Sequence, residues 1–185
     1  QSITCVKCHS DVSTHLDRPC ETVDKVDCSN CHAETSEFYD ASGHGMAYQR
    51  KEANAPYCTD CHGDHAVKSR YDDTSPTYRS SIPSLCGQCH RNDGKASQMT
   101  DLKEENAFSD YTLSIHGKGL AEKGLLPSAI CTDCHTTHFV LKESDERSSV
   151  HPKNIPKTCA ACHEGIYNIY IKSEHSILHD NEDLK

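Results

Sequence analysis

The 185-residue sequence has no tryptophan, only three phenylalanines and no long hydrophobic run. Its hydrophobic fraction is 35%, against roughly 45–50% in an ordinary globular domain. So few apolar side chains cannot offset a conformational entropy cost of about 1–2 kcal/mol per residue. Either the chain is disordered, or disulfides, metals or large apolar cofactors replace the missing core.

Positive charge is also scarce, since the sequence has 19 Lys and Arg residues and 28 Asp and Glu residues, which gives a net charge of −9. This acidity argues against nucleic acid or an anionic membrane surface as the main partner. The sequence contains no apolar run of about 18 residues, so we predict no transmembrane segment. Its length corresponds to one domain, or two small ones.

Cysteine and histidine are abundant, with 13 and 14 residues. An odd number of cysteines excludes a fully paired intrachain disulfide framework. Twelve cysteines form six C-x-x-C pairs, and each pair is followed at once by histidine. The paired cysteines are Cys5 and Cys8, Cys28 and Cys31, Cys58 and Cys61, Cys86 and Cys89, Cys131 and Cys134, and Cys159 and Cys162. The histidines that follow are His9, His32, His62, His90, His135 and His163.

C-x-x-C-H is the attachment signature of c-type haem. Two thiols one helical turn apart reach the two vinyl groups on one porphyrin edge, and the histidine then lies under the iron as the proximal ligand. Zinc sites built from C-x-x-C pairs need no histidine after every pair. A redox dithiol would occur once, within a βαβ pattern. The six motifs therefore predict six covalently bound haem c groups.

On these motifs the sequence resembles the multihaem c-type cytochromes of bacterial and archaeal anaerobic respiration. The resemblance extends from Cys5 to His175, and the motifs specify haem number rather than one physiological role. It implies maturation outside the cytoplasm, and hence a periplasmic or extracellular location.

An internal repeat adds further histidines. C-T-D-C-H-x-x-H begins at Cys58 and again at Cys131, 73 residues later, and ends at His65 and His138. Y-x-x-S-x-H occurs three times, at residues 39–44, 111–116 and 170–175. We therefore predict a single hexahaem domain made of three two-haem modules, at about residues 1–57, 58–130 and 131–185.

In the cytochromes that this chain resembles, such histidines commonly supply the distal axial ligand. The repeats and the early His15 select one distal candidate per iron: His15, His44, His65, His116, His138 and His175. A histidine three residues after a motif histidine projects from the same helix face, so we expect His65 and His138 to reach another motif's haem. His175 could serve the sixth haem or an iron in another subunit.

Several residues stay open at this stage. We predict His151 and His179 to be surface residues, because neither has a repeat counterpart. Cys20 could be a free thiol, an intermolecular disulfide partner or an iron ligand. Met46 and Met99 are weaker ligand candidates, since spare histidines are present. We expect the Y-x-x-S-x-H tyrosines to pack on porphyrin, and the serines either to cap helices or to hydrogen-bond a ligand imidazole.

The predicted fold is mostly irregular, with a few short α-helices, little or no β-structure, and the chain wrapped around six haems as in multihaem cytochromes c. The helical patterns cover residues 34–46, 97–120 and 163–179. Gly, Pro, Ser, Asp and Asn break the rest into loops.

Bis-histidine iron has no open coordination position, which favours an electron carrier over an enzyme. The expected partners are redox proteins, or copies of the chain itself, since resembling proteins of this size form extracellular filaments. The alternative is a soluble shuttle or a subunit of a quinone-linked membrane complex. A multihaem reductase would need one open iron, and no motif here has lysine in place of histidine.

Overall fold

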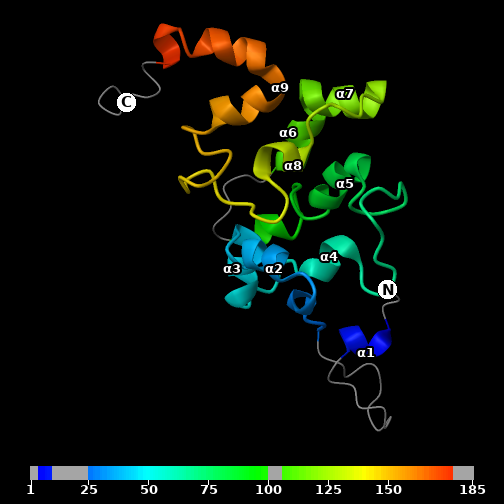
Figure 1. Ribbon diagram of the computed structural model, residues 1–185. Coiled ribbons are helices and arrows are strands. Elements are labelled where there is room, and N and C mark those ends of the chain that lie inside the picture. Colours follow the sequence, from blue (N-terminus) through cyan, green and yellow to red (C-terminus); the bar gives the residue numbers. More distant parts are fainter. Residues whose placement is uncertain (1–3, 10–24, 100–105, 177–185) are drawn as a thin grey trace.

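The computed structural model describes residues 4–9, 25–99 and 106–176, and Figure 1 shows their arrangement. About 52% of these residues are helical, and no strand occurs among them. The expectation of little or no β-structure is confirmed for the described residues. The chain is more helical than expected.

Nine α-helices and three short 3₁₀-helices occur in the described residues, and all but one of the α-helices have at most nine residues. The α-helices are α1 (Cys5–Cys8), α2 (Ala33–Asp40), α3 (Gly43–Gln49), α4 (Cys58–His62), α5 (Ile82–Gly87), α6 (Ala107–Leu113), α7 (Ile115–Lys123), α8 (Cys131–His135) and α9 (Ile155–Tyr170). The 3₁₀-helices are η2 (Cys28–Asn30), η3 (Arg79–Ser81) and η4 (Ala96–Gln98).

The C-x-x-C-H motifs start or occupy many of these helices. In α4 the Asp60 carboxylate accepts a hydrogen bond from the Tyr57 backbone N–H at 2.7 Å, and in α8 Asp133 accepts one from Ile130 at 2.8 Å. Each carboxylate satisfies a backbone donor at the helix start that would otherwise lack a partner. The repeated C-T-D-C-H sequence therefore produces the same short helix twice.

The repeat continues in the backbone beyond these helices. Gly63 ends α4 at a φ of 75°, and Thr136 ends α8 at a φ of 65°, with nearly equal ψ angles. Threonine rarely adopts a positive φ, so the second copy keeps this turn despite its side chain. Farther on, Ser75 and Ser148 are both 2% exposed. The two copies are thus structural repeats as well as sequence repeats.

Two of the predicted helices are in fact pairs of helices. Residues 34–46 divide between α2 and α3. Residues 97–120 contain the end of η4 and then α6 and α7, and residues 100–105 lie outside the described residues. The break falls at Ser42 in the first case and at Ser114 in the second, because each serine is the N-cap of the following helix. The third predicted helix, residues 163–179, agrees in its start with the second part of α9, because α9 consists of two helices joined at a kink at His163, where φ is −112° and ψ is 42°. The helix ends at Tyr170, and residues 177–179 lie outside the described residues.

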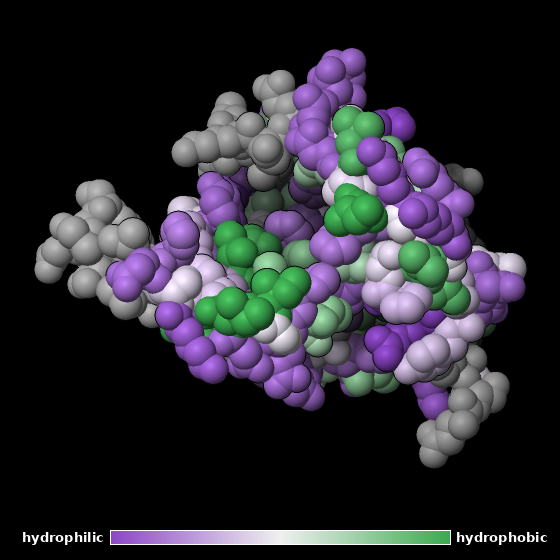
Figure 2. All heavy atoms as spheres, turned by 90° about the horizontal axis from the view of Figure 1, so that it is seen from above, coloured by the Kyte–Doolittle hydropathy of each residue, from purple (hydrophilic) through white to green (hydrophobic). Residues whose placement is uncertain are grey.

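The helices enclose little apolar core. The buried apolar residues among the described ones are Ala47, Ile82, Ala96, Ile130 and Leu141. The chain exposes 13531 Å², whereas a compact monomer of 20.5 kDa exposes about 8,800 Å². Figure 2, seen from above, shows groups of apolar side chains lying at the surface among polar ones. The low hydrophobic content therefore appears in the fold as an open arrangement of short helices.

The elements follow one another along the molecule, with α1 at one end and α9 at the other (Figure 1). None of the described helices is long and apolar enough to span a bilayer.

Candidate axial histidine pairs and cysteine motifs

Eight of the predicted iron ligands lie in four pairs, each made of one motif histidine and one predicted distal histidine. The distances between ring centres are 6.1 Å for His9 and His65, 6.0 Å for His62 and His138, 6.0 Å for His90 and His44, and 6.1 Å for His163 and His116. The structure thus brings together residues that are far apart in the sequence.

This separation fits two imidazoles on opposite sides of one metal ion. A metal–nitrogen bond of about 2 Å on each side, with roughly 1 Å from each nitrogen to its ring centre, gives about 6 Å between ring centres. Aromatic pairs in general spread over about 4.5–7 Å, whereas these four lie within 6.0–6.1 Å. The interplanar angles run from 16° to 44°, and each ring can rotate about its bond to a metal.

Each pair supplies two nitrogen donors. No group of three or more His, Cys, Asp or Glu side chains in the described ranges is arranged to hold a metal ion. Nδ1 of His9 is buried and has no hydrogen-bond partner among those residues. A buried polar atom without a partner costs about 1–3 kcal/mol, which coordination or a further hydrogen bond would remove. Two histidines per site match a haem iron, whose other four ligands come from the porphyrin.

The pairing follows a rule when the motifs are numbered one to six along the chain. His65 follows the third motif and faces His9 of the first, and His138 follows the fifth motif and faces His62 of the third. An H-x-x-H histidine therefore reaches back two motifs. Neither histidine faces the histidine of its own motif, in agreement with the sequence-based expectation.

The Y-x-x-S-x-H histidines reach in the opposite direction. His44 follows the second motif and faces His90 of the fourth, and His116 follows the fourth and faces His163 of the sixth. Motifs one and three are thus paired with a histidine that follows the motif two places later, and motifs four and six with a histidine that follows the motif two places earlier. The sequence left this assignment open.

Three described candidates stand outside these pairs. His32 of the second motif, His135 of the fifth and His175 have no ring contact with another described histidine. Since His163 already faces His116, the sixth motif does not need His175. The predicted ligand His15, together with Cys20 and His179, lies outside the described residues.

Burial favours the neutral form of four of the eight paired histidines. It lowers the pKa of His44 to about 4, with a smaller contribution from His90. Burial is also the main cause of the lowered pKa of His62, His90 and His138. A neutral imidazole has a free lone pair, which is the form that binds a metal.

Two serines hold His44 and His116 in place. The Ser42 hydroxyl donates to the Tyr39 carbonyl at 2.6 Å and accepts from the Gly45 N–H at 3.1 Å, and Ser114 makes the same two bonds with Tyr111 and Gly117. We expected these serines either to cap helices or to hydrogen-bond a ligand imidazole. The observed bonds show that Ser42 and Ser114 are helix caps. His44 and His116 consequently lie in the first turn of a capped helix.

The glycine after each of these histidines is required by close backbone approach. A Cβ at Gly45 would lie 2.0 Å from the Tyr39 carbonyl oxygen, and one at Gly117 would lie 2.1 Å from that of Tyr111. The third copy has Ser176 at this position, and there the N–H of Ser176 donates to the Ser173 carbonyl at 3.1 Å instead. The sequence-based interpretation missed these glycines, although S-x-H-G in two copies is a visible signal.

Two of the tyrosines connect the segments that carry His44 and His116 to the start of the next motif. Tyr39 donates its hydroxyl to the Pro56 carbonyl at 2.5 Å, and Tyr111 donates to the Ala129 carbonyl at 3.1 Å. Both carbonyls lie two residues before the first cysteine of the following motif. Burial raises the pKa of Tyr39 and Tyr111, so both remain donors. The expectation of packing alone was therefore incomplete.

Cysteines of consecutive motifs also approach one another, and the described motif cysteines are all free thiols. Burial, followed by the neighbouring Cys28, raises the pKa of Cys58 to about 11. A hydrogen bond with Cys131, followed by burial, raises the pKa of Cys86. The second motif thus adjoins the third, and the fourth adjoins the fifth.

The remaining neighbours in the series approach in the same way. Burial is the main cause of the raised pKa of Cys61, and Cys89 of the fourth motif adds to it. The pKa of Cys134 is raised by burial and then by Cys159 of the sixth motif. Motifs two to six therefore form a continuous series in space.

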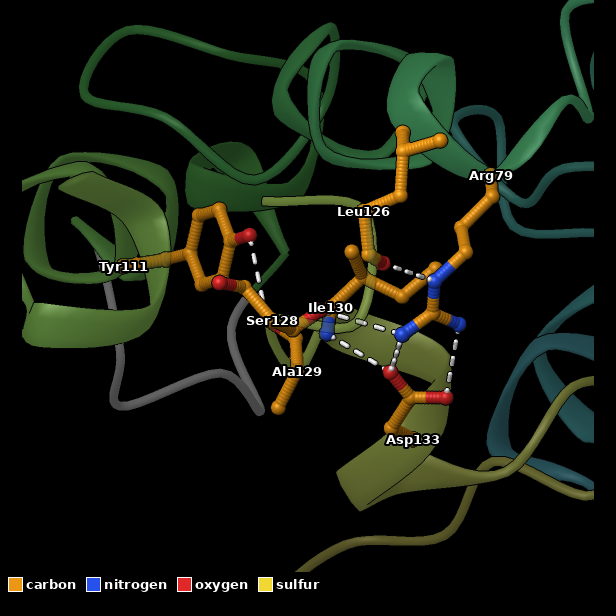
Figure 3. A network of polar contacts seen from close by, with 7 residues as sticks. All are labelled: Arg79, Tyr111, Leu126, Ser128, Ala129, Ile130 and Asp133. Atoms are coloured by element: carbon orange, nitrogen blue, oxygen red, sulfur yellow. Dashed lines mark hydrogen bonds and ion pairs between the residues drawn. The ribbon is translucent and has the colours of Figure 1, made fainter. Parts of the chain in front are cut away.

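A polar network joins the second module to the third (Figure 3). The Arg79 guanidinium donates to both carboxylate oxygens of Asp133 at 3.1 and 2.7 Å, to the Leu126 carbonyl at 2.7 Å and to the Ser128 carbonyl at 3.0 Å. Burial raises the pKa of Asp133, but the hydrogen bonds from Arg79 and Ile130 outweigh this and hold that pKa below its usual range. Because Asp133 also starts α8, the network fixes the fifth motif. The sequence-based interpretation missed Arg79, which has no counterpart at the equivalent position of the repeat, Pro152.

His151 is half-buried, and its Nδ1 accepts a hydrogen bond from the Lys153 N–H at 3.3 Å. Met46 lies on α3 and is 37% exposed.

Comparisons of the chain with protein-family models, with curated proteins and with solved structures found no match.

Proposed function

We propose that this chain is an electron-transfer protein that binds six haem c groups through its twelve motif cysteines. The observation that carries the proposal is the set of four histidine pairs, each about 6 Å between ring centres and each containing one C-x-x-C-H histidine. Haem iron held between two histidines cycles between the ferric and ferrous states and has no open position for a substrate.

Apolar side chains that the fold leaves exposed also support this function. Ile115 is 75% exposed and Ile166 is 67% exposed, although both lie in described helices. Porphyrins would cover such side chains and supply the apolar mass that the composition lacks. The helices and ligands would then become ordered together, so the haem-free chain should be largely unfolded.

The approach of cysteines from consecutive motifs supports transfer from one site to the next. Cys28 adjoins Cys58, and Cys86 adjoins Cys131. Since thiols mark where porphyrin edges attach, these contacts would bring neighbouring edges together. The protein's part is to fix that spacing and to exclude water around the ligands.

The cell location and partners belong to the same proposal. The chain would be exported to the periplasm or cell surface and would act in anaerobic respiration or extracellular electron transfer. Its net charge of −9 favours basic patches on redox partners and encounters that weaken with salt. A soluble shuttle, a subunit of a quinone-linked complex and a filament subunit differ only in what the chain contacts.

Intact-mass measurement and spin-state spectroscopy test the proposal together. We expect a mass corresponding to six covalently bound haems, low-spin ferric iron, and little binding of CO to the reduced protein. Any other haem number would refute the proposal. One iron per chain that is high-spin and binds CO in the fully assembled protein would favour the alternative, a multihaem reductase with an open site.

A further inference from the structure

The two C-T-D-C-H motifs carry an aspartate in the same position. In the third motif the Asp60 carboxylate accepts a hydrogen bond from the Tyr57 N–H at 2.7 Å, and in the fifth the Asp133 carboxylate accepts one from Ile130 at 2.8 Å. Each aspartate lies between the two cysteines of its motif, beside the residues that would hold a porphyrin. The two sites therefore carry the same negative charge in the same place.

In the fifth motif an arginine balances this charge. Arg79 donates to both carboxylate oxygens of Asp133, at 3.1 and 2.7 Å, and its bonds to the Leu126 and Ser128 carbonyls hold it there (Figure 3). An arginine side chain keeps its charge across the whole working range of pH. The two side chains are 38% and 36% exposed, so solvent screens part of this effect but leaves the geometry fixed by four bonds.

The third motif has no such partner in the described part of the chain. None of the ion pairs there includes Asp60. Lys25 does approach this motif, but its Nζ lies over the ring of Tyr57, 5.2 Å from the ring centre. Its ammonium therefore contacts an aromatic ring rather than the carboxylate. The third motif keeps a negative charge that Arg79 balances in the fifth.

We infer that Arg79 makes the haem iron at the fifth motif easier to reduce than the iron at the third. Reduction adds an electron, so a nearby negative charge opposes it, and a balancing positive charge removes that opposition. A unit charge about 10 Å away, at an effective dielectric constant of about 20, changes a one-electron equilibrium by roughly tenfold. The inference rests on the proposed function, because it concerns haem iron.

The position of Arg79 gives this difference a direction along the chain of sites. Motifs two to six form a continuous series in space, in which the fourth lies between the third and the fifth. A hydrogen bond with Asp133 is the main cause of the raised pKa of Arg79, and Cys162 of the sixth motif makes a smaller contribution. The guanidinium therefore lies near the sixth motif as well. Electrons entering at the third motif would collect toward the fifth and sixth.

The test measures the midpoint potential of each haem in the loaded protein, after intact mass has established six haems. A redox titration followed by nuclear magnetic resonance separates the haem signals, and nuclear Overhauser contacts with the residues of each motif assign them. Arg79→Met should lower the reduction equilibrium of the fifth haem by up to about tenfold, or about 59 mV. Asp133→Asn should shift the same haem in the opposite direction, because it removes the negative charge and leaves the positive one.

Two further variants separate the charge of Arg79 from its structural role. Arg79→Lys keeps the charge but cannot make all four bonds, so the urea midpoint should fall while the fifth potential stays near its native value. Asp60→Asn should raise the third potential toward the fifth, and it remains a test if Arg79→Met fails to fold. The matched control is Arg147→Met, which removes an arginine that is 61% exposed and should leave both potentials nearly unchanged.

Two results would overturn the inference while the proposed function stands. One is a shift of the fifth potential in the same direction in Arg79→Met and Asp133→Asn, since loosening of the site, and not charge, would then be the cause. The other is a native fifth haem whose potential is equal to or lower than that of the third. A haem number other than six would instead refute the proposed function.

Discussion

Arg79 should contribute more to stability than any other ionic contact in the described part of the chain. Its guanidinium makes four hydrogen bonds to the segment from Leu126 to Asp133, which lies about 50 residues farther along the chain. A hydrogen bond with one charged partner contributes about 1.5–3 kcal/mol where the partners are shielded from water. The side chains of Arg79 and Asp133 are 38% and 36% exposed, so solvent screening reduces this considerably. We therefore expect Arg79→Met to cost about 2 kcal/mol, roughly a thirtyfold change in the unfolding equilibrium.

The matched control is Arg147→Met. Arg147 forms its ion pair with Asp145, only two residues away, and its side chain is 61% exposed. Because that pair is exposed and connects no distant segments, its loss should leave the urea midpoint nearly unchanged. Urea unfolding of the haem-loaded protein, followed by the absorbance of low-spin iron, measures both variants.

A double-mutant cycle with Asp133→Asn isolates the ion pair from the two carbonyl contacts. We expect a coupling of about 0.5–1 kcal/mol, with the rest of the Arg79 effect preserved in the Asp133→Asn background. Equal destabilisation by Arg79→Met and Arg147→Met would refute the argument, because it would mean that the network of Figure 3 does not join the two modules.

Four further predictions follow from single contacts. His138→Ala should open one iron of six to CO, and His151→Ala should open none, because only His138 faces a motif histidine; equal CO stoichiometry would contradict the assigned pairs. Gly45→Ala should lower the free energy of unfolding by about 2–4 kcal/mol, since its Cβ would meet the Tyr39 carbonyl. Gly165→Ala, which has open space around it, should instead stabilise α9 by up to about 1 kcal/mol in the same urea assay. Tyr39→Phe should cost about 1 kcal/mol through the lost bond to Pro56, and Tyr71→Phe, at an exposed side chain, should be neutral. Burial lowers the pKa of His44 to about 4, and a metal ligand must also be neutral, so the unfolded chain takes up this proton first as pH falls and the haem-loaded protein should lose stability below about pH 6.5; urea midpoints that stay unchanged between pH 7 and pH 4 would contradict this expectation.

Much of the site was predictable because its chemistry depends on spacing along the chain. The six C-x-x-C-H motifs and the repeated histidines are patterns of neighbouring residues, and a pattern of that kind is fully visible in the sequence. The absence of strands among the described residues also agrees with the scarcity of alternating apolar patterns.

What the sequence did not reveal depends on contacts between distant residues. Nothing near His65 indicates that its ring faces His9, 56 residues earlier, because that contact arises from tertiary packing. The break at Ser114 was missed because a helical pattern was extended across a strong N-cap residue. The role of Arg79 could not be seen either, since an arginine in a polar loop carries no signal of its partner.

The histidine pairing also determines how this chain can be divided and made. Every observed pair joins residues at least 46 positions apart, and a cut near residue 57 or near residue 130 would separate two pairs each. The three modules are therefore units of sequence duplication but not of folding. Contacts of such long range slow folding, because the intervening chain must be ordered before they form. A chain that emerges from its N-terminus would bring His9 out well before His65 is available, so a haem attached at the first motif would wait for its second protein ligand. Expression of isolated modules should yield open irons rather than small stable cytochromes.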